Sequence, residues 1–286
     1  MADRFALPSH PLKASIRRRV VSLFNDAQKG ETPVPRSDHA LFARDSVVWR
    51  VHGDVTSMMV GGVAGLLLQM LHPAVLAGVW DHSNFRTDMH GRLRRTARFI
   101  STTTYADAAQ ARAAMATVRR IHQRVSGRLP DGTPYQANDP ELLAWVHVTE
   151  TTSFLDAWIR YAEPLMPVAE QDRYFAQMAR VGEALGAAPV PRSRAEARQI
   201  IQWFRPQLKA DERTREVARL VLGKGNERIG NGRIGDAPRR LTMQAAVDLL
   251  PPWARTLHGL AVSPLERPLV RAGTFGVAQT LRWAFR

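Results

Sequence analysis

Apolar residues recur along most of this chain at every third or fourth position, which is the spacing of one face of an α-helix. Between Asp107 and Val125 the spacing is most regular, with steps of four, three, four and three. The members of this stripe are Ala111, Met115, Val118, His122 and Val125. Arginines occupy the other sides, so only the stripe is expected to face inward. The pattern predicts a helix that carries a histidine on its buried face.

The same periodicity predicts further helices over residues 92–103, 139–161, 170–185, 193–204 and 212–222. Two shorter helical segments complete the chain, the last starting at Ser263-Pro264. Start and stop signals support these limits. Asp139-Pro140-Glu141 is typical of a helix start, with an N-cap followed by proline and an acid in the first turn. Gly186 is expected to end the helix predicted over 170–185. Runs of β-branched residues are short, so the predicted class is all-α.

The stretch from Asp54 to Gly78 is the most hydrophobic part of the chain. Its glycines at 61, 62 and 65 would let another helix or a flat ligand approach the backbone closely. Pro73 should kink or end this helix and leave His72 at the break. Because Gln69, His72 and Pro73 interrupt the apolar segment Met58–Trp80, we expect a buried central helix rather than a membrane span.

The domain organisation predicted from the pattern is simple. Residues 1–40 look like a polar N-terminal arm without the apolar region of a secretory signal. Residues 129–135 have strong turn chemistry, and the Gly- and Arg-rich stretch 224–240 is predicted to be a loop or a disordered connector. No internal repeat or strong boundary divides the remainder, so residues 41–286 are expected to be a single all-helical domain.

Composition narrows the chemistry. The chain has 286 residues, of which 45% are hydrophobic, and no cysteine; its mean hydropathy is −0.25. These values are typical of a soluble globular protein. Without cysteine there is no disulfide, no cysteine-ligated cluster, no thiolate-ligated haem and no covalent CxxCH attachment. Any haem must be held non-covalently, most simply by histidine. The absence of disulfides fits a cytoplasmic protein.

The formal net charge is +14 and the isoelectric point is near 11.2. Such a charge suits nucleic acid or an anionic membrane surface. The basic residues are spread over many helices, and no zinc-finger or RNP-like signature occurs. Nucleic acid is therefore not favoured, while peripheral contact with an anionic membrane stays open. The oligomeric state is not indicated.

Four histidines are candidates for a buried site. His122 either bonds a neighbouring carbonyl or carboxylate in the core, or ligates the iron of a cofactor. His147, on the next predicted helix, has the same alternatives and could also support the same pocket. His72 and His82 flank the kinked segment; each either contributes to the pocket, or caps free carbonyls or stabilises a turn.

The run Arg92-Leu-Arg-Arg-Thr96 reads by itself as a solvated basic face. Beside a haem its arginines could pair with the propionates, and one could face the distal side. Other chemistries find little support, because the chain has no GxSxG elbow, P-loop or HExxH motif.

Taken in order, several short blocks resemble the MpaB-type oxygenase family, which includes the latex-clearing rubber oxygenases. The blocks are Gly62-Val-Ala-Gly-Leu-Leu-Leu-Gln-Met-Leu-His72-Pro73, Gly78-Val-Trp-Asp81-His82-Ser83, Gly91-Arg-Leu-Arg-Arg-Thr96, Val118-Arg-Arg-Ile-His122 and Trp145-Val-His147. The resemblance covers roughly residues 45–190. The helices over 193–286 look specific to this lineage and are expected to pack on that core.

The resemblance implies an all-helical, globin-like core that binds haem b. It implies that His122 ligates the iron from the proximal side. Arg92, Arg95 and Thr96 match the pocket motif near the distal face and are the catalytic candidates. The candidate haem-binding residues are His122, Arg92, Arg119, His147, His82 and His72. The roles of His82 and His147 are not assigned by the resemblance.

One position departs from the rubber-cleaving members, which have a lysine where this chain has Arg95. That lysine can coordinate iron, whereas arginine stays protonated and is a poor iron ligand. Cleavage of polyisoprene is therefore not expected.

The leading hypothesis is a haem b-dependent oxygenase that uses O₂ on a hydrophobic, isoprenoid or lipid-like small molecule. One alternative is a haem-binding or sensing protein without turnover. Another is a cofactor-free basic protein that binds nucleic acid or an anionic membrane.

Overall fold

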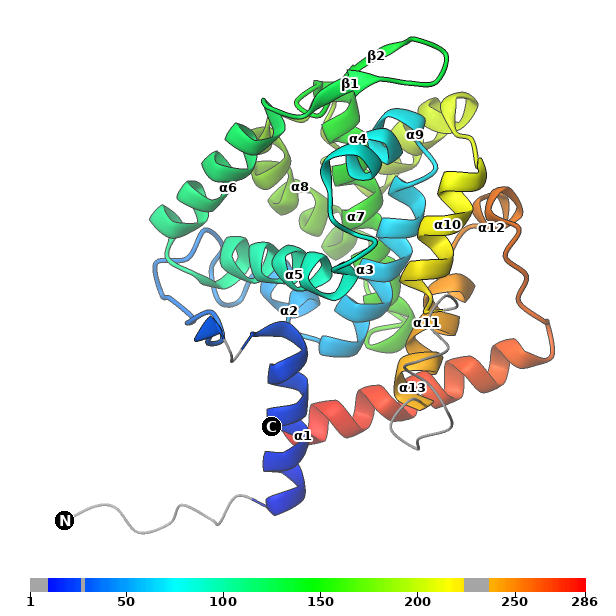
Figure 1. The fold of residues 1–286 in the computed structure, drawn as a ribbon. Helices are drawn as coiled ribbons and strands as arrows, with labels where there is room; N and C mark the ends of the chain where they lie inside the picture. Colours follow the sequence, from blue (N-terminus) through cyan, green and yellow to red (C-terminus); the bar gives the residue numbers. More distant parts are fainter. Residues whose placement is uncertain (1–9, 27–28, 224–236) are drawn as a thin grey trace.

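The computed structural model describes residues 10–26, 29–223 and 237–286, and this part of the chain is built almost entirely from helices (Figure 1). The all-α class is confirmed; the globin-like arrangement of the core is not. The helices are α1 (Pro11–Phe24), α2 (Val47–His52), α3 (Val55–Gln69), α4 (Pro73–His82), α5 (Met89–Tyr105), α6 (Ala108–His122), α7 (Pro140–Tyr161), α8 (Val168–Leu185), α9 (Arg194–Phe204), α10 (Glu212–Val221), α11 (Ala237–Leu249), α12 (Pro252–His258) and α13 (Glu266–Phe285), with a short 3₁₀ turn, η2 (Arg205–Gln207).

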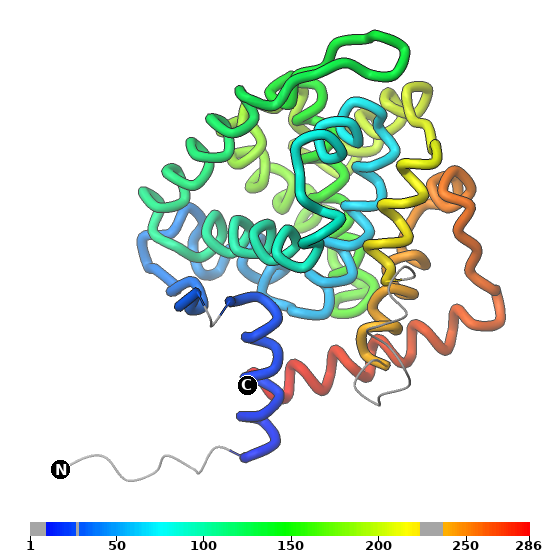
Figure 2. Tube along the Cα trace, in the orientation of Figure 1, coloured from blue at the N-terminus to red at the C-terminus, as the bar shows by residue number. Residues whose placement is uncertain are grey.

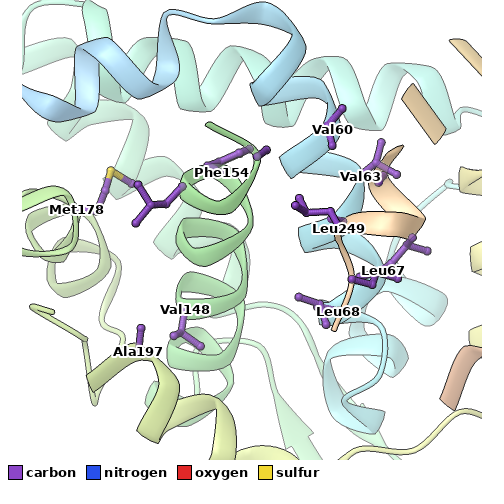
Figure 3. Close-up of a cluster of buried hydrophobic side chains, with 14 of the residues drawn as sticks. Val60, Val63, Leu67, Leu68, Val148, Phe154, Met178, Ala197 and Leu249 are labelled. Atoms are coloured by element: carbon purple, nitrogen blue, oxygen red, sulfur yellow. The ribbon is translucent and has the colours of Figure 1, made fainter. Parts of the chain in front are cut away.

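Two central helices, α3 and α7, make the most extensive contact in the molecule. Gly61 explains how closely they pack, because a Cβ at that position would lie 2.7 Å from the Ser153 carbonyl oxygen and 2.8 Å from the Phe154 Cα. Figure 3 shows apolar side chains of α3 gathered beside Phe154 of α7 and Leu249 of α11. The surrounding helices α8, α9, α11 and α13 join the same hydrophobic core, which runs from Leu41 to Val270.

The break predicted at Pro73 is confirmed. Helix α3 ends at Gln69, α4 begins at Pro73, and the two helices are bent by 103°. His72 is the N-cap of α4: its Nδ1 accepts a hydrogen bond from the Ala74 amide, 3.3 Å away. The residue thus caps the start of a helix rather than the free carbonyls that the sequence suggested. Within the described ranges no single helix is long and apolar enough to cross a membrane; the bent pair α3–α4 passes only by length and composition.

The helix limits read from the sequence agree closely with the structure. Asp139 accepts hydrogen bonds from the amides of Glu141 and Leu142 at the start of α7. Gly186 ends α8 with φ = 97°, a left-handed conformation that favours glycine. Before α9, the Ser193 hydroxyl accepts from the Glu196 amide, whereas the Glu196 carboxylate accepts from the Arg192 amide, so only half of the capping box indicated by Ser193 and Glu196 is formed.

Three segments differ from expectation. Residues 11–24 of the predicted polar arm form α1, which packs on α13. Residues 237–240 of the predicted loop begin α11, and the rest of that loop lies outside the described residues. The turn over 129–135 connects a short antiparallel hairpin, β1 (Ser126–Arg128) and β2 (Pro134–Gln136), in which Ser126 pairs with Gln136.

Candidate functional site

The inward face of α6 is tightly packed at one end and open at the other. Ala111 and Met115 are 0% and 3% exposed, whereas Val118, His122 and Val125 further along the same stripe are only half-buried. The stripe predicted from the sequence is therefore present, but the helix moves away from the core as it approaches His122. The last turn of α6 is therefore less completely covered than the turns that carry Ala111 and Met115.

Burial also changes along α5, but here it increases towards the C-terminal end of the helix. Thr103 and Thr104, at its C-terminal end, are buried, whereas its N-terminal half is half-buried or exposed. The two helices pack on each other and on α2 and α8. Figure 2 shows α5 and α6 diverging from their short connection. We call the half-buried surface of these two helix ends, together with the half-buried positions of α3 and α7 given below, the α5–α6 wedge.

The core side of this wedge is formed by two incompletely covered stripes. On α3 five half-buried positions step by four, three, four and three, namely Val55, Met59, Gly62, Leu66 and Gln69, and Met58 beside them is half-buried as well. On the N-terminal half of α7 the half-buried positions after Glu141 are Leu142, Val146 and Glu150. The Gln69 side-chain amide donates to the Val146 carbonyl, 3.4 Å away, and joins the two stripes. Helices α9 and α11 cover another side of α3 and α7, and α4 packs on α7.

His122 is the last residue of α6, and its imidazole is uncommitted. Neither ring nitrogen makes a hydrogen bond to any described residue, and Nδ1 is buried without a partner. Burial lowers the pKa of His122, so the ring is neutral at pH 7 and keeps one lone pair available. The alternative of a core histidine bonded to a carbonyl or carboxylate is not what this structure shows.

His147 lies on α7 and is buried against α8. Its Nε2 has no hydrogen-bond partner among the described residues. Desolvation lowers the pKa of His147 to about 4, so it is neutral as well. Arg119 contacts the same part of α8, where its guanidinium donates to the Ala184 carbonyl at 3.5 Å. The structure thus brings His147 and Arg119 to the C-terminal end of α8. Arg119 lies on α6, one helical turn before His122.

Arg92 and His82 meet around the C-terminal end of α4. The Arg92 guanidinium donates to the Ser83 hydroxyl at 3.0 Å, and the ring of His82 contacts the Ser126 carbonyl at 3.0 Å. Desolvation, followed by the nearby charge of Arg95, lowers the pKa of Arg92. A half-buried arginine that has one side-chain partner is suited to receive an anionic group.

The other predicted site residues are engaged elsewhere. Arg95 is 59% exposed and contacts Asp88 at 3.3 Å, while the Thr96 hydroxyl bonds back to the Arg92 carbonyl at 3.2 Å. Their place near a distal haem face stays a prediction. His72 uses both nitrogens at the α3–α4 bend, where Nε2 lies 3.3 Å from the Gln207 side-chain oxygen. It is not among the uncommitted histidines.

Sequence reasoning missed Glu150. This carboxyl group makes no hydrogen bond or salt bridge within the described residues, and desolvation raises its pKa to about 7. A signal was available, because Glu150 follows Leu142 and Val146 at intervals of four on the central helix. A carboxyl group whose pKa is raised to about 7 inside a helical core is a candidate proton donor or acceptor.

The donor set fits a haem better than a metal ion held by side chains alone. In the described ranges, no three His, Asp or Glu side chains come together in a way that could hold a metal ion. A porphyrin iron needs only one protein ligand, and the unpartnered imidazole of His122 can supply it. Arg92 offers a partner for a propionate, and the half-buried apolar stripes offer surface for the macrocycle.

The sequence matches a family described as "ER-bound oxygenase mpaB/B'/Rubber oxygenase, catalytic domain" over residues 49–283. The chain therefore belongs to this oxygenase family. The match extends through α13, so the C-terminal helices are part of the family domain and not specific to this lineage, as the shorter resemblance over 45–190 suggested. No curated protein and no solved structure matches the chain.

Proposed function

We propose that this protein is a haem b-dependent oxygenase that acts on a hydrophobic small molecule, isoprenoid or lipid-like in character. The observation that carries the proposal is the half-buried imidazole of His122 at the end of α6, which is neutral and makes no hydrogen bond to a described residue. Membership of an oxygenase family supports the class of reaction.

In this proposal His122 is the protein ligand of the iron, and Arg92 neutralises a propionate. Haem, when bound, supplies the iron at which dioxygen is activated. The pairing with Arg92 is favoured because a desolvated guanidinium gains more from an anion than an exposed one does. His147, which projects from α7 against α8, supports the site without being a ligand.

The substrate class follows from the side chains that line the wedge. Leu66 of α3, Val79 of α4 and Val146 of α7 are half-buried, so an apolar molecule that covers them would release water. Glu150 is the ionisable group on this surface. With a pKa of about 7, its carboxylate oxygen can accept a proton from the substrate and return it at neutral pH.

Absorption spectroscopy of the purified protein, before and after addition of haemin, tests the proposal. We expect a Soret band that is lost in His122→Ala and retained in His90→Ala, which removes an exposed histidine of α5. A protein that stays colourless with haemin, or a band unchanged in His122→Ala, would refute it. Oxygen consumption with isoprenoid or fatty-acid substrates then separates an oxygenase from a haem sensor, because only the former consumes O₂.

A further inference from the structure

Helix α13 exposes large apolar side chains in its first half and again at its C-terminal end, with Gln279 and Thr280 exposed between them. Leu265, at its N-cap, and Leu269 are 86% and 73% exposed, and Phe275, Trp283 and Phe285 continue the exposed set towards the C-terminus. The opposite side buries Val270, Thr274, Ala278 and Ala284 against the protein. The helix therefore has a covered face and a second apolar face that no described residue covers.

Helix α1 extends this apolar surface at the same end of the molecule. Helix α1 crosses α13 and packs on it near the C-terminus (Figures 1 and 2). Arg17 donates a hydrogen bond to the Ala284 carbonyl, and the Lys13 ammonium lies 5.0 Å from the centroid of the Trp283 ring. Leu12 and Leu23 of α1 are also exposed, so these two helices and the N-cap residue Leu265 carry seven of the eleven large exposed hydrophobic side chains of the described residues. We call this surface the α1–α13 face.

Positive charge surrounds the α1–α13 face. Its cations include Lys13, Arg18 and Arg19 on α1 and Arg271 and Arg286 on α13, whereas Glu266 is the one acidic residue of the two helices. Apolar side chains bordered by cations and almost free of acids are the pattern of helices that lie in a membrane interface.

An arginine cluster where the N-terminal half of α13 meets α11 carries unbalanced charge. Four guanidinium groups surround the buried carboxylate of Asp248, and the nearest is Arg271, with Nε at 2.7 Å. The others are Arg160 at 3.1 Å, Arg267 at 3.2 Å and Arg255 at 3.9 Å. Asp248 is the one acid that pairs with them in the described ranges, and the buried Nε of Arg267 makes no hydrogen bond despite its proximity. The cluster has capacity for a further anion.

We propose that the α1–α13 face docks on an anionic phospholipid bilayer, with the Asp248 arginine cluster receiving a lipid phosphate. Other occupants fit less well. A second copy of the chain would bring the same cations together, and nucleic acid would leave Leu265, Leu269 and Phe275 in water. A zwitterionic bilayer could bury the apolar side chains of this face but would leave its positive charge without an anionic partner. The proposal is independent of haem binding.

Sedimentation of the full chain with vesicles tests the proposal. We expect binding to phosphatidylcholine vesicles that contain phosphatidylglycerol, and much weaker binding to phosphatidylcholine alone. Leu269→Glu should lower the partition coefficient about tenfold or more, because a side chain that enters the interface becomes charged. Leu165→Glu is the matched control, since Leu165 is 93% exposed on a connection far from this face in sequence and should change little. A second comparison uses two exposed tryptophans: Trp283→Ser on α13 should weaken vesicle binding, whereas Trp203→Ser on α9 should change it little.

The arginine cluster is tested separately with Arg271→Gln and with inorganic phosphate as a competitor. We expect Arg271→Gln to reduce the preference for anionic vesicles, whereas Arg44→Gln, an exposed arginine outside this face, should not. Free phosphate that displaces the protein only weakly supports a lipid phosphate; complete displacement at low concentration would show a site for soluble phosphate and overturn this part of the proposal.

The docking proposal itself would be overturned by equal binding to both vesicle types, or by equal losses in the Leu269 and Leu165 variants. Self-association that Leu269→Glu abolishes, without any vesicle binding, would assign the face to a second copy. Circular dichroism of each variant shows whether the fold is retained before binding is compared.

Discussion

The imidazole of His147 on α7 lies directly against Gly182 on α8. A Cβ on Gly182 would come within 2.9 Å of Nε2, 3.0 Å of Cδ2 and 3.1 Å of Cε1 of the ring. The glycine thus creates the room that a buried histidine needs between two packed helices. Its role is a close approach, because Gly182 lies inside α8.

Gly182→Ala is therefore expected to displace the His147 ring and to destabilise the protein by about 1–3 kcal/mol, as overpacking in a core does. Gly276→Ala is the matched control: Gly276 also lies within a helix, but a Cβ there meets nothing within 4 Å. That substitution should be neutral or slightly stabilising, because alanine has the higher helix propensity. Urea denaturation measures both, and equal effects of the two would contradict the packing argument.

Glu150→Gln should change how stability depends on pH. In the native protein the pKa of Glu150 is raised to about 7, so the folded state holds a proton that the unfolded chain releases above about pH 4.5. The free energy of unfolding consequently falls as pH rises between these values and stays lower above pH 7.

Glutamine cannot ionise and removes this penalty. We expect Glu150→Gln to gain stability relative to the native chain by on the order of 1–3 kcal/mol more at pH 8 than at pH 5. Denaturant titrations at the two pH values give the difference. Glu141→Gln, an exposed site on the first turn of the same helix, controls for the substitution. A difference independent of pH would show that the Glu150 carboxylate is well solvated.

How far the sequence could predict this structure differs between helices and sites. Asp139, Gly186 and Pro73 act on neighbouring backbone groups, so their effects on α7, α8 and α4 could be read locally. The inward stripe of α6 was also readable, because periodicity depends on one helix alone. The fall in burial along α6 towards His122 could not be read from the sequence. It depends on how α5 and α6 pack on α2 and α8, which are far apart in sequence.

The same distinction applies to individual residues of the site. The sequence could present His122 as a histidine on an apolar face, but only the packed structure shows that its ring finds no partner. The engagement of His72 with Gln207 joins positions 135 residues apart and has no local signal. The extent of the family domain was underestimated because the recognisable blocks stop near residue 147, whereas the match continues to 283.

His52 should make the protein sensitive to acid. Its two ring nitrogens lie 2.8 Å from the Thr104 hydroxyl and 2.9 Å from the Tyr174 hydroxyl, and burial lowers its pKa to about 3. Below about pH 6.5 the unfolded chain therefore binds a proton that the folded chain does not, and the free energy of unfolding decreases as pH falls.

Replacing His52 by leucine leaves two buried hydroxyls without their partner, which should cost about 1–3 kcal/mol at pH 7. The loss of stability between pH 6.5 and pH 4 should also become shallower, though it should not vanish, because His147 remains. His39→Leu, at an exposed position, should alter neither quantity. A variant with an unchanged acid slope would mean that the folded state protonates His52 readily.

The seam between α3 and α7 offers a contrast between adjacent glycines. A Cβ on Gly61 would meet backbone atoms of α7 at 2.7 and 2.8 Å, whereas one on Gly62 would meet only the Phe154 ring at 3.6 Å, an ordinary contact. Backbone cannot move aside as a flexible side chain can, so Gly61→Ala must push the two central helices apart.

We expect Gly61→Ala to lower the free energy of unfolding by about 3 kcal/mol or more, with partial unfolding at ambient temperature. Gly62→Ala should keep the stability within about 1 kcal/mol and improve helix propensity. Thermal unfolding of the two variants distinguishes these outcomes, and a Gly62→Ala protein as unstable as Gly61→Ala would show that the side of α3 facing the wedge is already fully packed.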